Sequence, residues 1–511
     1  MNAMRSMPQE RQSHGCRNFF LILLVGALII SVVFVSADFL KGRTILNVQV
    51  GDQQAAQIDL NQSFAISPYL LGSNVFPRAG TNSQDQAKSG FMSYDQQVIR
   101  DLNSAHIKLL RFPGGNWGEV HVPSTTQLND FSNLLNQVNA EGMMQVPLSD
   151  PLDVTPVSLQ TRASRAALLV DYMDNRQSIQ RTDPNAPFHP ITYWTIGNEP
   201  DLLTNPDTRR TYTAKNYAQT FITYSLAMHQ KDPNIKIFGP EISQYAGKTG
   251  PRDATGKLWM DEFITEVSAY ARTHSLPFHI LDGISFHRYP FGDAQAPANA
   301  LLNSPAQTTQ VLPSLRQLIR QQFGTDLPIA ITEINTNSQK NEPPQNLAAV
   351  WWASTLGELM NNQVELVAFF STQGVDLPYP LLTQHLTETA MLRVMQLFAQ
   401  LQPELVPIPE VQGPVNIYAT QDQEHTTASL LLVNTTPDSQ VVHVQAASTL
   451  PLSPWQNTSL TLPAYGMAVL TIHRNASSEA FHFNNVENAQ QDAPELQHLV
   501  CQKNSDNTEA C

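Results

Sequence analysis

The sequence predicts a (β/α)₈ barrel of the α/β class, followed by a C-terminal antiparallel β-sandwich and preceded by an N-terminal apolar segment. Between residues 63 and 402, short apolar runs rich in β-branched residues alternate with segments of helical periodicity. Eight strands alternating with helices fit a barrel with insertions. An open doubly wound sheet shares this alternation, but the sequence has neither the Gly-x-Gly-x-x-Gly nor the Walker motif that usually follows its first strand.

Each predicted barrel strand is a buried run that ends in loop-forming or polar residues. The predicted strands cover residues 69–74, 107–112, 143–147, 193–197, 236–239, 283–286, 329–332 and 366–370. The predicted helices between them cover residues 94–105, 131–140, 162–175, 213–230, 259–274, 312–323 and 348–360.

Beyond residue 403 the pattern changes to short alternating strands separated by polar turns. The predicted strands are 415–420, 428–434, 441–445, 458–462 and 466–473, which favours a β-sandwich over residues 403–475. Residues 44–62 contain two short strands that we expect to join this sheet. Residues 476–511 are polar and lack apolar periodicity, so they are predicted to be a flexible tail.

The first 43 residues contain an export or anchoring signal. Residues 19–37 are almost uninterruptedly apolar and follow Arg5, Arg11 and Arg17. The run is long enough for a marginal membrane span, whereas Val35, Ser36 and Ala37 match the small-residue pattern of a cleaved signal peptide. Both alternatives stay open, and both place the rest of the chain outside the cytoplasm. The membrane is a partner only if the segment remains uncleaved.

The length and net charge of the chain limit its domain organisation and the classes of partner that it binds. The chain has 511 residues, which suggests roughly two or three domains. Its net charge of −14 argues against nucleic acid, because phosphate binding depends on Lys and Arg. The sequence does not indicate an oligomeric state.

The three cysteines lie near the two ends of the chain. Cys16 stands beside the apolar run, and Cys501 and Cys511 stand in the predicted tail, where they could form a disulfide or remain free. Their positions argue against thiol catalysis and against a cysteine-ligated metal. We expect no metal and no cofactor.

Two glutamates carry the strongest functional signal. Glu199 and Glu333 each follow a buried strand, the fourth and the seventh, at the edge where barrel enzymes build their sites. Glycoside hydrolysis needs one protonated carboxyl to assist the leaving oxygen and one ionised carboxylate to attack the anomeric carbon. The apolar neighbours Trp194 and Ile196 suggest a raised pKa for Glu199 as a hypothesis.

Further polar side chains follow the other strands and complete a ring of candidate substrate-binding residues. Trp117 is predicted either to stack on a sugar or to pack, and Glu241 either to bind substrate or to cap a helix. The candidates are Arg111, Asn116, Trp117, Asn198, Glu241, His287, Tyr289 and Gln373.

The chain resembles glycoside hydrolase clan A, the retaining (β/α)₈ glycosidases. The resemblance rests on Gly-Asn-Glu-Pro at residues 197–200, Ser-Phe-His-Arg-Tyr at 285–289 and Thr-Glu at 332–333. It implies that Glu199 is the acid/base, that Glu333 is the nucleophile and that Asn198 contacts the sugar 2-hydroxyl. It also implies that His287 and Tyr289 orient the nucleophile and line the subsite.

Two more segments are similar to the arabinofuranosidase, family-44-type endoglucanase and heparanase-related branches of that clan. They are Leu-Arg-Phe-Pro-Gly-Gly-Asn-Trp at residues 110–117 and the run at 462–472, and together the resemblance covers residues 45–475. The chain departs from many members at strand eight, where Phe-Phe-Ser-Thr-Gln at 369–373 stands in place of a tryptophan. No single branch, and therefore no single sugar, is implied.

The sequence thus predicts an exported or anchored retaining glycosidase that acts on a poly- or oligosaccharide. The alternative from a different class is a noncatalytic carbohydrate-binding cell-surface protein on the same scaffold. A transglycosidase, in which a sugar acceptor replaces water, is a further alternative.

Overall fold

The structure is a computed structural model that describes residues 44–78, 90–149, 157–292, 296–337, 343–374, 379–448, 455–474, 476–484, 493–505 and 508–511. The predicted apolar segment at 19–37 lies outside these ranges. Among the residues that are described, none of the helices has the length and apolar character needed to span a membrane.

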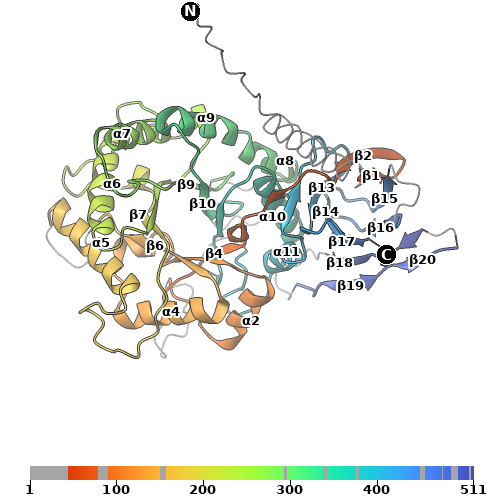
Figure 1. Cartoon of the computed structure of the whole chain (residues 1–511), viewed down its shortest axis with the longest axis horizontal. Coiled ribbons are helices and arrows are strands. Elements are labelled where there is room, and N and C mark those ends of the chain that lie inside the picture. The colour runs from red at the N-terminus through yellow and green to blue at the C-terminus, as the bar shows by residue number, and fades with distance from the viewer. Residues whose placement is uncertain are drawn as a thin grey trace, which may run out of the picture.

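Eight parallel strands close into a barrel, as the sequence predicts (Figure 1). Around the barrel the order is β10, β11, β4, β5, β6, β7, β8, β9. Neighbouring strands are therefore consecutive in the chain, except where β11 pairs with β4 and closes the barrel. The strands are β4 (Gly72–Asn74), β5 (Leu109–Phe112), β6 (Glu141–Val146), β7 (Tyr193–Ile196), β8 (Lys236–Ile242), β9 (Gly283–Arg288), β10 (Ile329–Ile334) and β11 (Leu366–Phe369).

Alternation along these strands fills the barrel and leaves its carboxyl end polar. One set of side chains forms a separate apolar cluster, made of Leu109, Met143, Tyr193, Phe238, Ala330 and Leu366, with Tyr69 packed against it. These residues come from six of the eight barrel strands, namely β5, β6, β7, β8, β10 and β11, and together they fill part of the barrel interior. The polar residues further along each strand are therefore carried to the opposite end.

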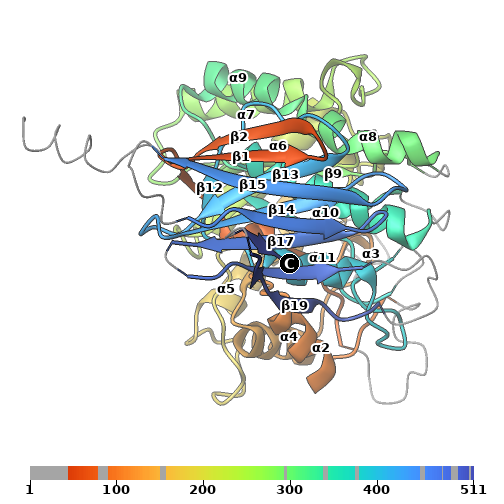
Figure 2. The same cartoon turned by 90° about the vertical axis from the view of Figure 1, so that its right-hand side faces the viewer.

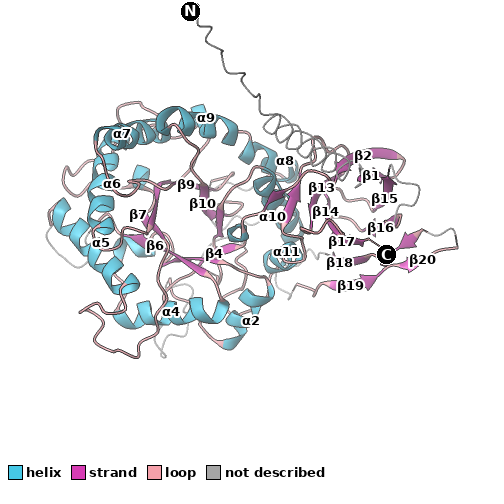
Figure 3. Cartoon of the chain, viewed as in Figure 1, coloured by secondary structure: helices cyan, strands magenta, loops and turns pink. Residues whose placement is uncertain are grey.

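Helices surround the barrel (Figure 3). They are α2 (Gln96–Ser104), α3 (Trp117–Val120), α4 (Thr125–Val138), α5 (Leu159–Asp174), α6 (Ala214–His229), α7 (Trp259–Thr273), α8 (Ala298–Thr309), α9 (Leu312–Phe323), α10 (Gln345–Asn361) and α11 (Ala390–Phe398). Short 3₁₀ turns occur at η1 (Pro68–Leu70), η2 (Pro200–Leu202) and η3 (Gly247–Thr249). Helix α8, which the sequence analysis did not predict, contains Pro305 and few apolar residues.

Two antiparallel sheets pack beside the barrel as the predicted sandwich (Figure 2). One has the order β2, β1, β15, β16, β21, β20, and the other β19, β18, β17, β14, β13, β12, β3. The N-terminal strands join it through pairing of β1 with β15. The strands are β1 (Thr44–Val50), β2 (Gln53–Asp59), β3 (Phe64–Ala65), β12 (Glu404–Val406), β13 (Val415–Gln421), β14 (Thr427–Asn434), β15 (Gln440–Ser448), β16 (Thr458–Leu462), β17 (Met467–His473), β18 (Glu479–Phe483), β19 (Gln497–Val500), β20 (Gln502–Lys503) and β21 (Glu509–Ala510).

The C-terminal region differs from the flexible tail that the sequence predicts from residue 476. Strand β18 pairs with β17 and β19, and β21 pairs with β16. A disulfide joins Cys501 to Cys511, and the buried carboxylate of Glu509 accepts a hydrogen bond from the Ser478 amide at 2.9 Å. Long-range pairing and the cross-link order a segment that its polar composition alone would leave unfolded.

The barrel and the sandwich share one hydrophobic core through α10. Tyr418 on β13 donates hydrogen bonds to the Ser354 carbonyl at 3.1 Å and to Glu358 at 3.3 Å. Gly357 lies directly under the Tyr418 ring, because a Cβ at this position would come within 2.4 Å of it. The glycine thus permits close packing of the helix on the sheet.

We therefore expect Gly357→Ala to destabilise the protein by about 1–3 kcal/mol, the usual cost of overpacking a core. A loss of stability would be informative, because Gly→Ala inside a helix otherwise stabilises a protein by about 1 kcal/mol. Chemical unfolding measures the change. In a Tyr418→Leu background the penalty should shrink, because the ring that collides is gone; an equal penalty in both backgrounds would contradict the packing.

Candidate active site

Glu199 stands just beyond β7 on a backbone bend. Gly197 has φ +79° and Glu199 has φ +47°, so the chain turns sharply where the strand ends. A Cβ at Gly197 would lie 2.5 Å from the Leu148 side chain, which explains the glycine. The Glu199 amide donates to the Glu241 carbonyl at 2.9 Å, which ties the bend to strand β8.

Glu333 lies within β10, and both of its carboxylate oxygens are held. Arg111 Nη1 donates to Oε1 at 2.9 Å, and the Tyr289 hydroxyl donates to Oε2 at 2.9 Å. A Cβ at Gly115 would lie 2.8 Å from Oε1 and 3.3 Å from the Phe370 ring. Gly115 therefore lets the backbone of the loop after β5 approach this carboxylate.

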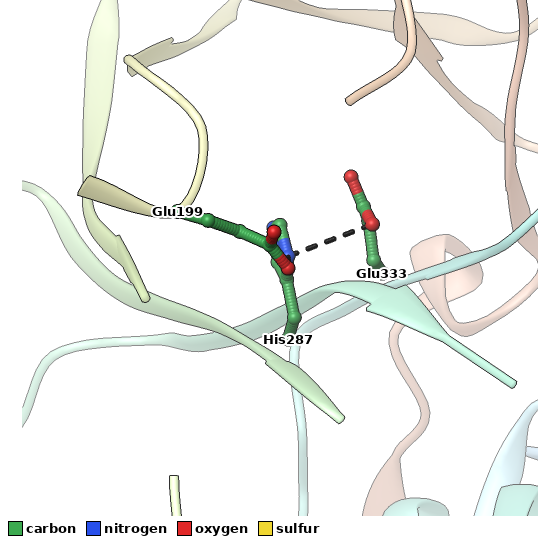
Figure 4. A group of neighbouring side chains, drawn as sticks. All are labelled: Glu199, His287 and Glu333. Carbon is green, nitrogen blue, oxygen red and sulfur yellow. Dashed lines mark hydrogen bonds and ion pairs between the residues drawn. The ribbon is translucent and has the colours of Figure 1, made fainter. Parts of the chain in front are cut away.

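Glu199 and Glu333 face each other with His287 between them (Figure 4). One ligand atom from each of the three side chains lies within 4.8 Å of the others. His287 Nδ1 is 3.0 Å from Glu199 Oε1 and 3.5 Å from Glu333 Oε2. The Glu199 side chain is 17% exposed and that of Glu333 is 6% exposed, so Glu199 is the more accessible carboxyl.

Arg111 connects the strands beneath these carboxyls. Its guanidinium is fully buried and forms ion pairs with Glu333 and Glu241, each at 2.9 Å. It also donates to Asn74 at 2.8 Å and to Asn198 at 3.0 Å. These contacts join β4, β5, β8 and β10 with the segment after β7.

Glu241 belongs to this buried layer and does not reach a substrate. It has no exposed surface, and its two oxygens accept hydrogen bonds from Arg111 and from the Thr332 hydroxyl at 2.8 Å. Burial opposes its ionisation, but the charges of Arg111 and His287 outweigh burial and lower the pKa of Glu241 to about 2. The structure therefore replaces both predicted roles, substrate binding and helix capping, by support of two cations.

His287 is the second buried cation. Burial lowers its pKa, but the negative charge of Glu333, the hydrogen bond to Glu199 and the nearby Glu241 carboxylate outweigh that effect and raise the pKa to about 10. Its Nε2 lies 3.6 Å from Glu241, which is an ion-pair distance and too long for a good hydrogen bond. The imidazolium therefore orients carboxylates and is not exposed to solvent.

The structure brings most of the predicted substrate-binding residues together, but Gln373 is not among them. Asn198 is buried and donates to the exposed Asn116 at 3.1 Å. Gln373 instead accepts from the Ser93 amide at 2.7 Å and donates to the Gln384 carbonyl at 3.0 Å. With both ends of its amide engaged, Gln373 anchors loops.

The Trp117 indole mainly packs against its neighbours and leaves little of its ring face free. The His121 ring stacks on it with centroids 4.5 Å apart, and Phe91 contacts it edge to face. A Cβ at Gly90 would come within 2.6 Å of the indole. Trp194, the apolar neighbour of Glu199 in the sequence, is fully buried.

Sequence reasoning missed several residues that support the site. Gln145 on β6 accepts from Arg111 at 3.4 Å, and Phe370 lines the approach to Glu333. A polar Gln145 within the apolar run of β6 was the available signal. Glu119, which is not among the predicted site residues, is 4% exposed and buried on α3.

Glu199, His287 and Glu333 are also the residues that could hold a metal ion. A metal binds neutral imidazole, whereas the three surrounding carboxyl groups favour protonated His287. A metal would therefore have to displace a strongly held proton.

Solved structures share this fold at low sequence identity. A bifunctional glucanase-xylanase, CelM2, from a metagenome library matches with TM-score 0.58 and 14% identity over 81% of this chain and 97% of its own. AbfB, a family 51 α-L-arabinofuranosidase from Bifidobacterium longum, matches with TM-score 0.59 and 15% identity over 88% and 95%. A family 44 xyloglucanase from Paenibacillus polymyxa matches with TM-score 0.56 and 12% identity over 81% and 98%.

These matches confirm the predicted fold resemblance to the family 44 and family 51 barrels. The family described as D-apionate lactonase, C-terminal immunoglobulin-like domain, matches residues 414–470, which run from β13 into β17. A search of curated proteins returned no match.

We expect Glu241→Gln to destabilise the fold by about 3–5 kcal/mol at pH 7, because it leaves Arg111 and His287 short of one buried counter-charge. A folded-state pKa near 2 means that the stabilisation is present above the ordinary glutamate value and is lost as pH falls towards 2. The difference between wild type and variant should therefore shrink below about pH 4.3.

Chemical unfolding across this pH range measures the effect. Glu266→Gln is the matched control, because Glu266 pairs with an exposed Lys215 and should change stability by less than about 1 kcal/mol. Equal stability of Glu241→Gln and wild type at pH 7 would contradict the assignment.

Proposed function

We propose that this protein is a retaining glycosidase in which Glu199 is the acid/base and Glu333 is the nucleophile. The observation that carries the proposal is the pair of carboxyl groups at one barrel mouth, with oxygen atoms within 4.8 Å of each other. Retaining enzymes separate the two carboxyls by about 5 Å, whereas inverting enzymes leave room for water at about 6.5–9.5 Å. The spacing favours double displacement.

The surroundings of each carboxyl support the assignment of roles. Glu333 receives hydrogen bonds on both oxygens, one of them from a guanidinium, which fixes a carboxylate for attack. Glu199 has one side-chain contact, to His287, and is the more exposed of the pair. It can therefore reach a leaving oxygen first and a water molecule afterwards.

In the first step, Glu333 attacks the anomeric carbon while Glu199 gives its proton to the departing oxygen. The glycosidic bond breaks, and an ester between the sugar and Glu333 forms. In the second step, Glu199 takes a proton from water, the water oxygen attacks the anomeric carbon, and the ester bond breaks. In this proposal Asn198, which accepts a hydrogen bond from Arg111, contacts the sugar 2-hydroxyl during both steps.

The charge of the cluster agrees with this cycle. Arg111 and His287 are cations, and Glu241 is held ionised. If Glu199 is protonated and Glu333 is ionised, the two positive and two negative charges balance. The proton that makes the buried layer neutral is therefore the one that the first step needs.

The proposed substrate is a poly- or oligosaccharide, which is the class named for the glucanase-xylanase and xyloglucanase of the same fold. A screen of aryl glycosides and polysaccharides with a fragment starting near residue 38 would identify the sugar. Saccharide binding without turnover would favour the noncatalytic alternative. Product analysis at high acceptor concentration would separate transglycosylation from hydrolysis.

We also propose that the enzyme works outside the cytoplasm, either secreted or anchored through residues 19–37. The Cys501–Cys511 disulfide supports this, because structural disulfides persist in oxidising compartments.

Alanine variants with azide should distinguish the two glutamates. Glu199→Ala and Glu333→Ala should each lower kcat by about 10³-fold or more on an unactivated glycoside that wild type cleaves. On an aryl glycoside whose leaving group needs no proton, azide should then rescue each variant, with opposite stereochemistry. With Glu333→Ala it attacks the substrate directly and gives an inverted glycosyl azide, and with Glu199→Ala it attacks the glycosyl-enzyme and gives a retained one. The same azide anomer from both would overturn the assignment.

The initial product should have the anomeric configuration of the substrate, because two displacements invert the anomeric carbon twice. Proton NMR during the first minutes of wild-type hydrolysis measures this before mutarotation. An inverted first product would show single displacement and refute Glu333 as nucleophile.

A further inference from the structure

The carboxyl group of Glu119 is buried beside the site and has no role in the proposed reaction. It lies on α3, directly after the loop that brings Gly115 to Glu333. Its Oε2 accepts from the Leu148 amide at 3.1 Å, and its Oε1 lies 3.5 Å from Gln145 Nε2. The Ser149 hydroxyl also donates to the Glu119 backbone carbonyl at 2.6 Å.

These donors connect Glu119 to the reacting groups from two sides. Gln145 accepts from Arg111, which holds Glu333 and Asn198. Leu148 packs against Gly197, at the bend before Glu199.

We propose that Glu119 is a positioning residue that holds Leu148 and, through it, the bend leading to Glu199, and that its ionised form holds them best. This inference rests on the proposed function. The chemistry of the site supports it, since both groups that contact the carboxylate donate: the Leu148 backbone amide and the Gln145 side-chain amide. A carboxylate accepts from both of them, whereas a protonated carboxyl adds a hydrogen among donors and must give up a contact.

Burial opposes ionisation of the Glu119 carboxyl, so that its protonated and its ionised form both occur near neutral pH. Burial raises the pKa of Glu119 to about 7, even though the hydrogen bonds from Leu148 and Gln145 lower it. Positioning should therefore weaken as pH falls below 7.

The other ionisable groups around Glu119 do not titrate in this range. Tyr212, Tyr217 and Tyr224 face it from the side of α6, and burial raises the pKa of each well above neutral. Arg111, reached through Gln145, stays charged. A transition near pH 7 that depends on residue 119 can thus be attributed to Glu119.

The experiment removes the acid/base so that its own titration does not interfere. In a Glu199→Ala background, kcat/KM is measured from pH 5.5 to 8.5 with the 2,4-dinitrophenyl glycoside of the sugar that wild type cleaves, whose leaving group needs no proton. We expect a rise of about tenfold with a midpoint near 7, the size expected for one hydrogen bond to a charged group. Adding Glu119→Gln should keep the rate at the lower level throughout, because the amide imitates the protonated carboxyl.

Glu266→Gln in the same background is the matched control and should keep the transition. Glu119→Asp keeps the charge and serves as a second variant if Glu119→Gln does not fold. It should keep the rise of kcat/KM with pH but reach a lower maximum rate. A transition unchanged by Glu119→Gln, or the absence of any transition in the Glu199→Ala parent, would overturn the inference. Failure of the proposed function is separate, since wild type would then cleave no glycoside in the screen.

Discussion

The buried guanidinium of Arg111 is the interaction on which the rest of the site depends. A fully buried charge is tolerated only when opposite charges and hydrogen bonds surround it, and Arg111 obtains these from Glu241, Glu333, Asn74 and Asn198. Its partners come from separate strands of the barrel. Closing the barrel around one cation therefore also sets the positions of Glu333, of Asn198 and, through Asn198, of Glu199.

A second cation, His287, makes the charge pattern useful for proton transfer. One guanidinium cannot balance three carboxyl groups, and a buried excess of negative charge would hold protons where the reaction needs a carboxylate. With Arg111 and His287 both charged, a single proton makes the cluster neutral. In the proposed cycle that proton is on Glu199, and Glu333 accepts hydrogen bonds from a guanidinium and a hydroxyl.

The sequence predicted what depends on local pattern and missed what depends on distant partners. The strands and the placement of Glu199 and Glu333 follow from apolar runs that end in polar residues, a signal contained in each segment. Glu241 looked equivalent, but its burial depends on Arg111, which lies 130 positions away. Gln373 resembled a site residue until the structure showed both ends of its amide bonded to backbone. The C-terminal segment looked disordered because strand pairing and the Cys501–Cys511 link leave little trace in composition.

The backbone at the barrel mouth shows why this arrangement is rigid. Glu199 and Glu241 both have left-handed backbone conformations, with φ +47° and +60°, which cost about 1–3 kcal/mol each for non-glycine residues. Such conformations persist only where neighbouring contacts hold them. The Glu199 amide donates to the Glu241 carbonyl, and Ser243, just beyond, donates both its amide and its hydroxyl to Asp201. The two strained turns thus stabilise each other, and Glu199 is fixed in the absence of a substrate, so that in the proposed reaction binding energy need not be used to order it.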